Sequence, residues 1–98
     1  MERGGYVYIL ANFTNTTLYI GVTSKLRSRI EEHKSNFYPG SFSSRYKTHK
    51  LVYYETFHSI EEAIAREKQL KAGRRKKKEE LINSFNKDWE DLYEGVTD

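Results

Sequence analysis

Two short segments near the start of the chain, residues 6–11 (Tyr-Val-Tyr-Ile-Leu-Ala) and residues 17–22 (Thr-Leu-Tyr-Ile-Gly-Val), are rich in aromatic and β-branched residues. Such runs are typical of strands, and residues 12–15 between them (Asn-Phe-Thr-Asn) have the composition of a turn. The two segments therefore predict an antiparallel hairpin, in which we expect Tyr8 to lie opposite Tyr19. Both tyrosines would then lie on one face of the sheet, an arrangement that core packing alone also explains.

The later part of the chain alternates helical and extended patterns. Ser59, followed three residues later by Glu62, has the signature of a capping box at the start of a helix. We expect helices from Thr23 or Ser24 to 34, from 60 to 72 and from 74 to 84, a strand at 51–54, and mostly loop at 35–50. The order β-β-α-β-α-α predicts an α+β fold with a three-stranded antiparallel sheet flanked by helices. The chain has 98 residues, which is the length of one domain, so we expect residues 1–98 to form a single domain.

Composition excludes several classes of protein. The sequence has no cysteine, which excludes disulfides and thiolate metal sites. No apolar run approaches the roughly 20 residues that a membrane span requires, and residues 1–5 lack the pattern of a signal peptide. We therefore expect a cytoplasmic protein that does not contact a membrane.

The positive charge is unevenly distributed. The net charge is +3, and the segment from Lys71 to Lys78 contains six basic residues and no acidic one. A clustered basic surface suits a polyanion such as nucleic acid. A solvated helix face explains most runs of this kind, so the cluster does not decide the function by itself.

The helix expected at 60–72 carries a carboxylate in an unusual place. At 100° per residue, Ala63, Ile64 and Leu70 share an apolar face, and Glu67 falls in the middle of that face. A buried carboxylate needs a compensating cation or hydrogen-bond donor. Glu67 is therefore either a structural partner of an Arg or Tyr, or an oxygen ligand for Mg²⁺, which often uses one or two protein carboxylates.

The first helix shows a similar anomaly. His33 lies between Leu26 and Ile30 on the helical wheel, and Arg29 lies along the edge of the same apolar stripe. A single histidine in such a place is usually structural. An arginine beside it adds a planar set of donors that matches a phosphate.

Taken in order and spacing, these residues resemble the GIY-YIG nuclease family. Tyr6-Val7-Tyr8 is similar to the first signature triplet, with Tyr6 in the place of the glycine, and Tyr19-Ile20-Gly21 matches the second. Arg29 and His33 follow as in the family's helix, and the segment from Ala65 to Lys71 resembles the later motif that contains a glutamate. The resemblance covers most of the chain, from about Tyr6 to Trp89. Within the family, the chain is similar to the compact free-standing bacterial members.

The resemblance implies a metal-dependent endonuclease that hydrolyses phosphodiester bonds with one Mg²⁺ (or Mn²⁺) ion. Glu67 would hold the metal and Arg29 would donate to the phosphate oxygens. Tyr8 would orient the attacking water and take its proton, and Tyr19 would position the phosphate or the water. His33 would support Tyr8 or relay its proton, so that either residue could be the effective base.

The resemblance also implies a nucleic-acid substrate, for which we expect DNA. The same module is found in larger relatives such as the incision subunit of bacterial excision repair, which makes DNA repair an expected role. An asparagine that assists in some members would be Asn83 or Asn86. A protein partner could supply target recognition. The alternative is a non-catalytic nucleic-acid-binding or partner-dependent module on the same scaffold. In either case the residues expected to contact nucleic acid are basic: Arg27, Arg45, Lys47, Arg74, Arg75 and Lys76.

Overall fold

The computed structural model describes residues 4–35 and 45–97. Its elements follow the predicted order β-β-α-β-α-α. Among these residues, no helix is both long enough and apolar enough to cross a membrane. Residues 36–44 of the predicted loop lie outside the described residues. The elements are β1 (Gly5–Ala11), β2 (Leu18–Thr23), α1 (Leu26–Lys34), β3 (Lys50–Phe57), α3 (Ile60–Ala72), α4 (Arg75–Phe85) and a short 3-10 helix, η1 (Tyr93–Gly95).

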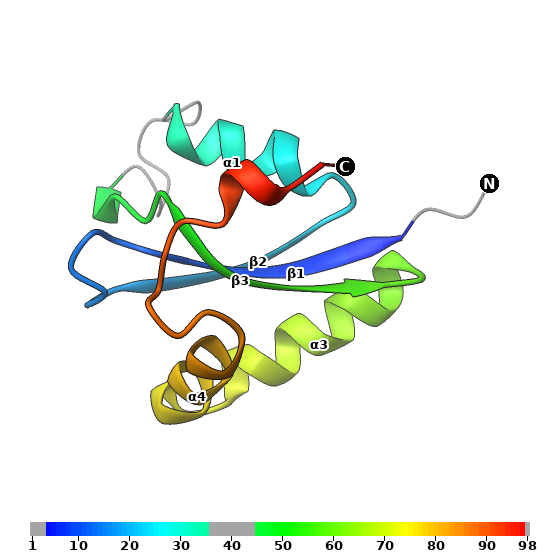
Figure 1. Ribbon diagram of the computed structural model, residues 1–98. Helices are drawn as coiled ribbons and strands as arrows, with labels where there is room; N and C mark the ends of the chain where they lie inside the picture. The colour runs from blue at the N-terminus through cyan, green and yellow to red at the C-terminus, as the bar shows by residue number, and fades with distance from the viewer. Residues whose placement is uncertain (1–3, 36–44, 98) are drawn as a thin grey trace.

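The three strands form an antiparallel sheet in the order β2-β1-β3, with helices on both faces (Figure 1). The helix α1 and the C-terminal segment cover one face, and α3 and α4 cover the other. The two-residue period of a strand sorts β1 accordingly. Tyr8 and Leu10 are buried on the α1 face, whereas Val7 and Ile9 are buried on the face of α3 and α4.

The predicted register of the hairpin is wrong by two residues. Tyr8 lies opposite Gly21, and Tyr19 lies opposite Leu10. The turn is longer than predicted because the Asn12 side chain caps it: its Oδ1 accepts hydrogen bonds from the backbone N–H groups of Thr16 (2.8 Å) and Thr17 (3.0 Å). A shift of two residues preserves the side-chain period, so Tyr8 and Tyr19 still share a face.

The helix boundaries are close to those predicted. The Ser59 side chain accepts a hydrogen bond from the Glu62 N–H at 3.3 Å and begins α3 at Ile60. Neither Thr23 nor Ser24 is the N-cap of α1. That position is Lys25, and Thr23 instead accepts from its N–H at 3.1 Å.

Close packing fixes α3 against the sheet. A Cβ on Gly5 would lie 2.9 Å from the Ala63 Cβ, so the missing side chain lets the helix approach β1. The C-terminal segment is held on the other side of β3, where the Leu92 N–H donates to the Leu51 carbonyl at 2.8 Å. These contacts tie α3 to β1 and the C-terminal segment to β3.

Candidate active site

Tyr8 is fully buried on the α1 face of β1, and its ring and hydroxyl lie directly over Gly21 of β2. A Cβ at position 21 would overlap the Tyr8 ring and hydroxyl, and it would approach the Tyr19 ring to 3.0 Å. The glycine of the second triplet is therefore required by the space that the tyrosine of the first triplet occupies.

His33 of α1 completes a cluster with the two tyrosines. The Tyr8 hydroxyl and His33 Nε2 are hydrogen-bonded at 3.0 Å. The Tyr19 ring lies 5.3 Å from the His33 ring and 6.2 Å from the Tyr8 ring, measured between centroids. The structure thus brings together three of the predicted site residues from three separate elements.

Arg29 lies one turn before His33 on α1 and is the fourth member of the cluster. Burial raises the pKa of Tyr8 above its ordinary value, and the nearby Arg29 guanidinium, which hydrogen-bonds with Tyr8, opposes that shift only in part. The guanidinium also pairs with Glu32 at 3.1 Å. In the free protein the Tyr8 hydroxyl therefore keeps its proton at neutral pH.

The state of His33 follows from the same surroundings. Burial, and then the positive charge of Arg29, lower the pKa of His33 to about 4. The imidazole is consequently neutral at pH 7, where one ring nitrogen can accept a proton. A protonated tyrosine next to a neutral histidine is a pair along which a proton can move.

Glu67 lies on α3, which covers the opposite face of the sheet from α1 (Figure 1). That Glu67 shares one concave surface with the other four residues stays a prediction. The helical wheel correctly placed Glu67 toward the interior, since its side chain is only 16% exposed and pairs with Lys71 at 3.3 Å. A wheel identifies the inner side of a helix, but it does not show which face of the sheet that helix covers.

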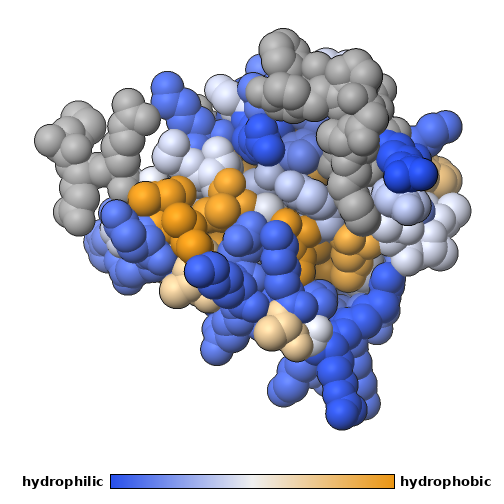
Figure 2. Space-filling model, turned by 180° about the vertical axis from the view of Figure 1, so that it is seen from behind, coloured by the Kyte–Doolittle hydropathy of each residue, from blue (hydrophilic) through white to orange (hydrophobic). Residues whose placement is uncertain are grey.

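β2 forms one edge of the sheet, so residues from the α1 face and from the face of α3 and α4 can approach each other there. Among the described residues, β2 pairs only with β1. A hollow beside β2 is lined by Leu18, Tyr19 and Ile20 of the strand together with Lys71 of α3 and Lys78 of α4. Figure 2 shows hydrophobic patches across the middle of the molecule, separated and bordered by hydrophilic side chains. Glu67 therefore lies one helical turn from a hollow that Tyr19 also borders.

The structure separates the basic residues predicted to contact nucleic acid into two groups. Two of them support the fold: Arg27 donates to the Val96 carbonyl at 2.7 Å, and Arg75 donates to the carbonyls of Asn15 (2.6 Å) and Thr16 (2.8 Å). The remaining four are exposed. These are Arg45, Lys47, Arg74 and Lys76.

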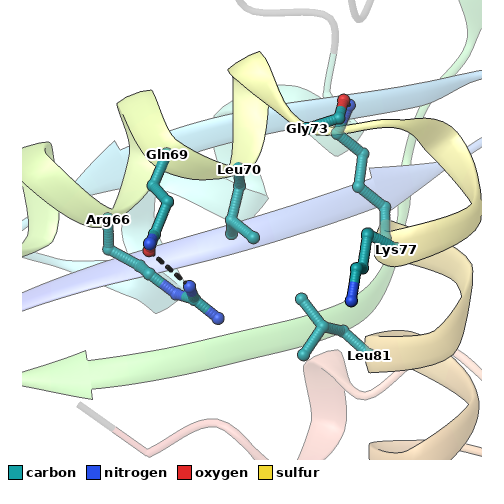
Figure 3. A pocket seen from close by; sticks show the side chains of 7 residues that line it. Arg66, Gln69, Leu70, Gly73, Lys77 and Leu81 are labelled. Atoms are coloured by element: carbon teal, nitrogen blue, oxygen red, sulfur yellow. Dashed lines mark hydrogen bonds between the residues drawn. The ribbon is translucent and has the colours of Figure 1, made fainter.

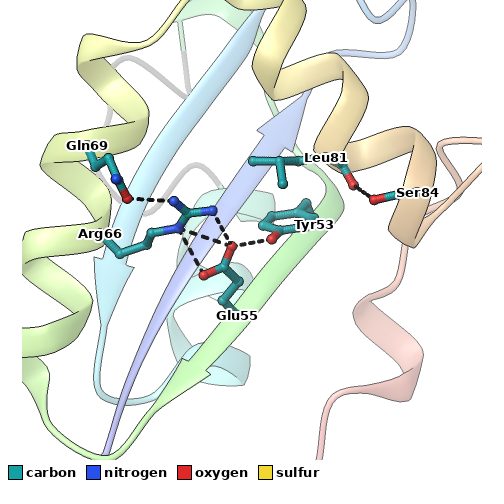
Figure 4. Close-up of polar contacts among 6 residues, drawn as sticks. All are labelled: Tyr53, Glu55, Arg66, Gln69, Leu81 and Ser84. Carbon is teal, nitrogen blue, oxygen red and sulfur yellow. Dashed lines mark hydrogen bonds and ion pairs between the residues drawn. The ribbon is translucent and has the colours of Figure 1, made fainter.

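A second polar network, which the sequence analysis did not identify, lies on the face of α3 and α4 (Figure 4). The Arg66 guanidinium donates to both oxygens of Glu55 (3.1 to 3.3 Å), and the Tyr53 hydroxyl donates to the same carboxylate. Glu55 lies two residues from both Tyr53 and Phe57 along β3, so the three side chains share one face of the sheet, the face that α3 and α4 cover. That position in the strand pattern was the available signal.

A cleft of about 370 Å³ between α3 and α4 adjoins this network (Figure 3). Leu70 and Leu81 form its apolar side, and Arg66 and Lys77 border it. The Arg66 guanidinium there is held by Gln69 at 2.6 Å as well as by Glu55. Most of the hydrogen-bonding capacity of this arginine is thus used within the fold.

Both candidate asparagines are engaged in structure. The Asn86 side chain is nearly buried, donates to the carbonyls of Val52 (3.2 Å) and Glu90 (2.7 Å), and accepts from the Glu90 N–H at 3.1 Å. Asn83 accepts a hydrogen bond from the Trp89 indole at 2.6 Å. Their contacts fix the C-terminal segment against β3 and α4.

Residues 4–80 match the model of the GIY-YIG catalytic domain, and the chain belongs to this nuclease-type family. Within it, the chain is similar to small UPF0213 proteins. It is 36% identical over 77 residues to one from Syntrophus aciditrophicus, which covers 79% of this chain and 87% of the relative. It is 37% identical over 83 residues to one from Natronomonas pharaonis, covering 84% and 94%.

The solution structure of a UPF0213 protein from Bacillus halodurans supports the same assignment. It is 32% identical in sequence, and the match covers 82% of this chain and 83% of that one with a TM-score of 0.51. The predicted family and the α+β fold are both confirmed.

Proposed function

We propose that the protein is a metal-dependent endonuclease that hydrolyses phosphodiester bonds in nucleic acid, with DNA as the expected substrate. The observation that carries the proposal is the hydrogen bond between the Tyr8 hydroxyl and His33 Nε2 at 3.0 Å, beside the Arg29 guanidinium. Arg29 pairs with Glu32 through Nη1, but its side chain is 35% exposed, so a phosphate can reach the guanidinium. Tyr19 borders the β2 hollow and would position the phosphate or the water.

The protonation states favour a relay through Tyr8 rather than a Tyr8 phenolate. The attacking water gives its proton to the Tyr8 oxygen as the Tyr8 proton passes to His33 Nε2, so the phenolate does not accumulate. The water oxygen bonds to phosphorus while the bond from phosphorus to the leaving 3′ oxygen breaks. The leaving oxygen takes a proton from solvent. Arg29 donates to the non-bridging oxygens as their negative charge increases.

The donor set fits Mg²⁺ (or Mn²⁺) only as an ion that keeps most of its waters. The described residues contain no group of three or more His, Cys, Asp or Glu able to enclose a metal. Glu67 offers a single carboxylate, and Mg²⁺ commonly binds through one or two carboxylates plus substrate phosphate and water. When bound by Glu67, the ion would stabilise charge on the phosphate and the leaving oxygen. Glu67 and Arg29 would therefore meet the substrate from opposite sides of the β2 edge.

One observation favours the alternative of a non-catalytic or partner-dependent nucleic-acid-binding module. Glu67 lies on α3, the helix across the sheet from α1, and already pairs with Lys71 at 3.3 Å. A Glu67 that only serves this ion pair would leave the cluster without a metal. The two functions therefore differ in what the Glu67 carboxylate does.

The variant Glu67→Gln tests this difference, because it keeps the side-chain volume and removes the charge. The control is Glu61→Gln, an exposed residue on the same helix. Plasmid nicking and thermal melting are measured with and without Mg²⁺. The endonuclease predicts that Glu67→Gln remains folded but loses both nicking and the Mg²⁺-dependent melting shift, whereas Glu61→Gln keeps both. A wild type whose melting and nicking ignore Mg²⁺, with a destabilised Glu67→Gln, supports the structural ion pair instead.

A further inference from the structure

Phe13 is placed unusually for an aromatic residue. It lies in the turn between β1 and β2 and is 91% exposed, more than any other large hydrophobic side chain among the described residues. The Asn12 side chain holds this turn in shape through two backbone hydrogen bonds. The Phe13 ring is therefore presented to solvent by an ordered turn rather than packed into a core. Single exposed apolar residues are common, so the surroundings decide whether this one has a role.

The surroundings form a positively charged hollow. Phe13 borders a hollow of about 340 Å³. The polar residues that line this hollow are Lys34, Lys47, His49, Lys50 and Asp91. Three lysines stand against one aspartate, and that aspartate is occupied by Lys34 and by the backbone N–H groups of Leu51 and Tyr93. The hollow thus combines a flat aromatic ring with a net charge of +2.

Lys47 is the cation best placed to meet a ligand. Lys34 is held by Asp91 and by the His49 carbonyl (2.9 Å), and Lys50 donates to Asn15 Oδ1 at 2.7 Å. Within residues 4–35 and 45–97, the exposed Lys47 ammonium makes no hydrogen bond or ion pair. Its backbone is left-handed, with φ of 57°, a conformation that costs energy for a lysine.

The hollow adjoins the tyrosine cluster. Lys34, which borders the hollow, directly follows His33 at the C-terminal end of α1. His49 of the hollow is close enough for its charge to lower the pKa of His33. A nucleic-acid strand whose scissile phosphate lies at the cluster would therefore have neighbouring nucleotides within reach of the hollow.

We propose that this hollow binds an unpaired nucleotide next to the scissile phosphate, with its base stacked on Phe13 and its phosphate at Lys47. The proposal rests on the proposed endonuclease function and narrows its substrate to nucleic acid with a single-stranded segment at the cut. An aromatic ring stacks on any exposed base, and cations beside it follow the backbone. The bases of a continuous duplex are already stacked on one another, so an intact duplex cannot offer Phe13 the face of a base. The surplus of lysines favours a polyanion over a neutral protein surface.

The test measures binding in EDTA, so that cleavage does not interfere, with fluorescein-labelled dT₁₅ and a duplex of equal length. Stacking contributes about 1–3 kcal/mol per base, so Phe13→Leu should weaken dT₁₅ binding between about five-fold and about a hundred-fold. Phe13→Tyr should retain it. Lys47→Asn suits the left-handed backbone and removes the charge, and it should weaken binding more than the control Lys87→Asn on the segment after α4. Duplex binding should change little in Phe13→Leu.

A second readout follows the stacking directly. Phe13→Trp should show indole quenching on addition of dT₁₅ beyond the wild-type change, which reports Trp89 alone. Equal dT₁₅ affinity in the wild type and Phe13→Leu, without quenching in Phe13→Trp, overturns this inference even if the enzyme cleaves nucleic acid. Loss of concentration-dependent self-association in Phe13→Leu, with unchanged dT₁₅ affinity, also overturns it and assigns the ring to contact between copies. A wild type that neither binds nor cleaves any nucleic acid contradicts the proposed function itself.

Discussion

The two faces of the sheet each carry a tyrosine beside an arginine, yet their chemistry differs. On the face of α3 and α4, the Tyr53 hydroxyl and the Arg66 guanidinium converge on one carboxylate, Glu55 (Figure 4). On the α1 face, the Tyr8 hydroxyl meets the neutral His33 imidazole, and Arg29 lies alongside. The partner of the tyrosine therefore distinguishes the two clusters, since the residue types are otherwise similar.

The difference decides where a reaction can take place. In the Glu55 cluster the opposite charges satisfy each other. Burial, together with the neighbouring Glu55 carboxylate, raises the pKa of Tyr53 to about 12, and the cluster holds β3 against α3. In the Tyr8 cluster the hydroxyl is hydrogen-bonded to the neutral His33 imidazole, so the Tyr8 proton has a neutral acceptor. Arg29 pairs with Glu32 through Nη1, but its side chain is 35% exposed, so an incoming anion can reach the guanidinium. A closed network stabilises the fold, whereas an open one can act on a substrate.

The largest expected effect comes from making the same substitution on both faces. Tyr8→Phe removes the hydroxyl of the proposed relay, so we expect nucleic-acid cleavage to fall by about 10²–10⁴-fold while the protein remains folded. Tyr53→Phe should leave cleavage unchanged and lower stability by only about 0.5–1.5 kcal/mol, because Glu55 keeps Arg66. Single-turnover cleavage and urea unfolding measure the two quantities. Equal losses of cleavage in both variants would remove the distinction between the faces.

The next effect concerns stability and should fall on the opposite face. Arg66→Ala leaves the Glu55 carboxylate with only the Tyr53 hydroxyl, and we expect a cost of about 1–3 kcal/mol, limited by the partial exposure of the pair. For a chain of this size, that corresponds to a melting temperature about 4–24 °C lower. Arg66→Lys is the matched control for charge without the planar fork. Calorimetry showing an unchanged melting temperature for Arg66→Ala would mean that the network does not stabilise the fold.

Acidification should expose the proton chemistry of the α1 face. The folded pKa of His33, about 4, lies below its unfolded value of 6.5, so the unfolded chain binds more protons between these values. Stability therefore falls as the pH decreases from about 6.5 to about 4. The full shift corresponds to about 3 kcal/mol, and partial exposure of the ring reduces the expected loss to about 1–2 kcal/mol. Urea unfolding of wild type and His33→Gln at pH 7 and pH 5 checks this, since Gln should remove that part of the slope.

Local patterns in the sequence predicted most of the fold. The order of elements and the bounds of α3 followed from strand composition and from the Ser59 capping signal, both of which act within a few residues. The register of the hairpin did not follow, because it depends on how the Asn12 side chain closes the turn. Whether Thr23 or Lys25 caps α1 likewise depends on turn geometry that composition does not fix.

The candidate site was predictable only within each element. Spacing placed Tyr8, Arg29 and His33 on inner sides, and the structure brings them together. The placement of α3 across the sheet from α1 was not predictable, because the wheel of a single helix contains no information about which face of a sheet the helix covers. The Tyr53–Glu55–Arg66 network was missed because the predicted strand ended at residue 54, whereas β3 continues to Phe57 and places Glu55 on a face covered by helices.

The smallest expected effect concerns the exposed cations Lys76 and Lys77 on the first turn of α4. Arg75 and Lys78 of the same run are tied to the fold through backbone carbonyls, so nucleic-acid contact from α4 would rest on these two lysines. If they touch phosphates, the double variant Lys76→Ser and Lys77→Ser should reduce the slope of log affinity against log salt by about 0.9 per lost contact on duplex DNA. Lys68→Ser, exposed on α3, is the control, and fluorescence anisotropy at several salt concentrations gives the slopes.

An unchanged slope would identify the run as a solvated helix face. A reduced one would mean that the face carrying the closed Glu55 network also contacts nucleic acid, which would confine the contrast between the two faces to proton transfer.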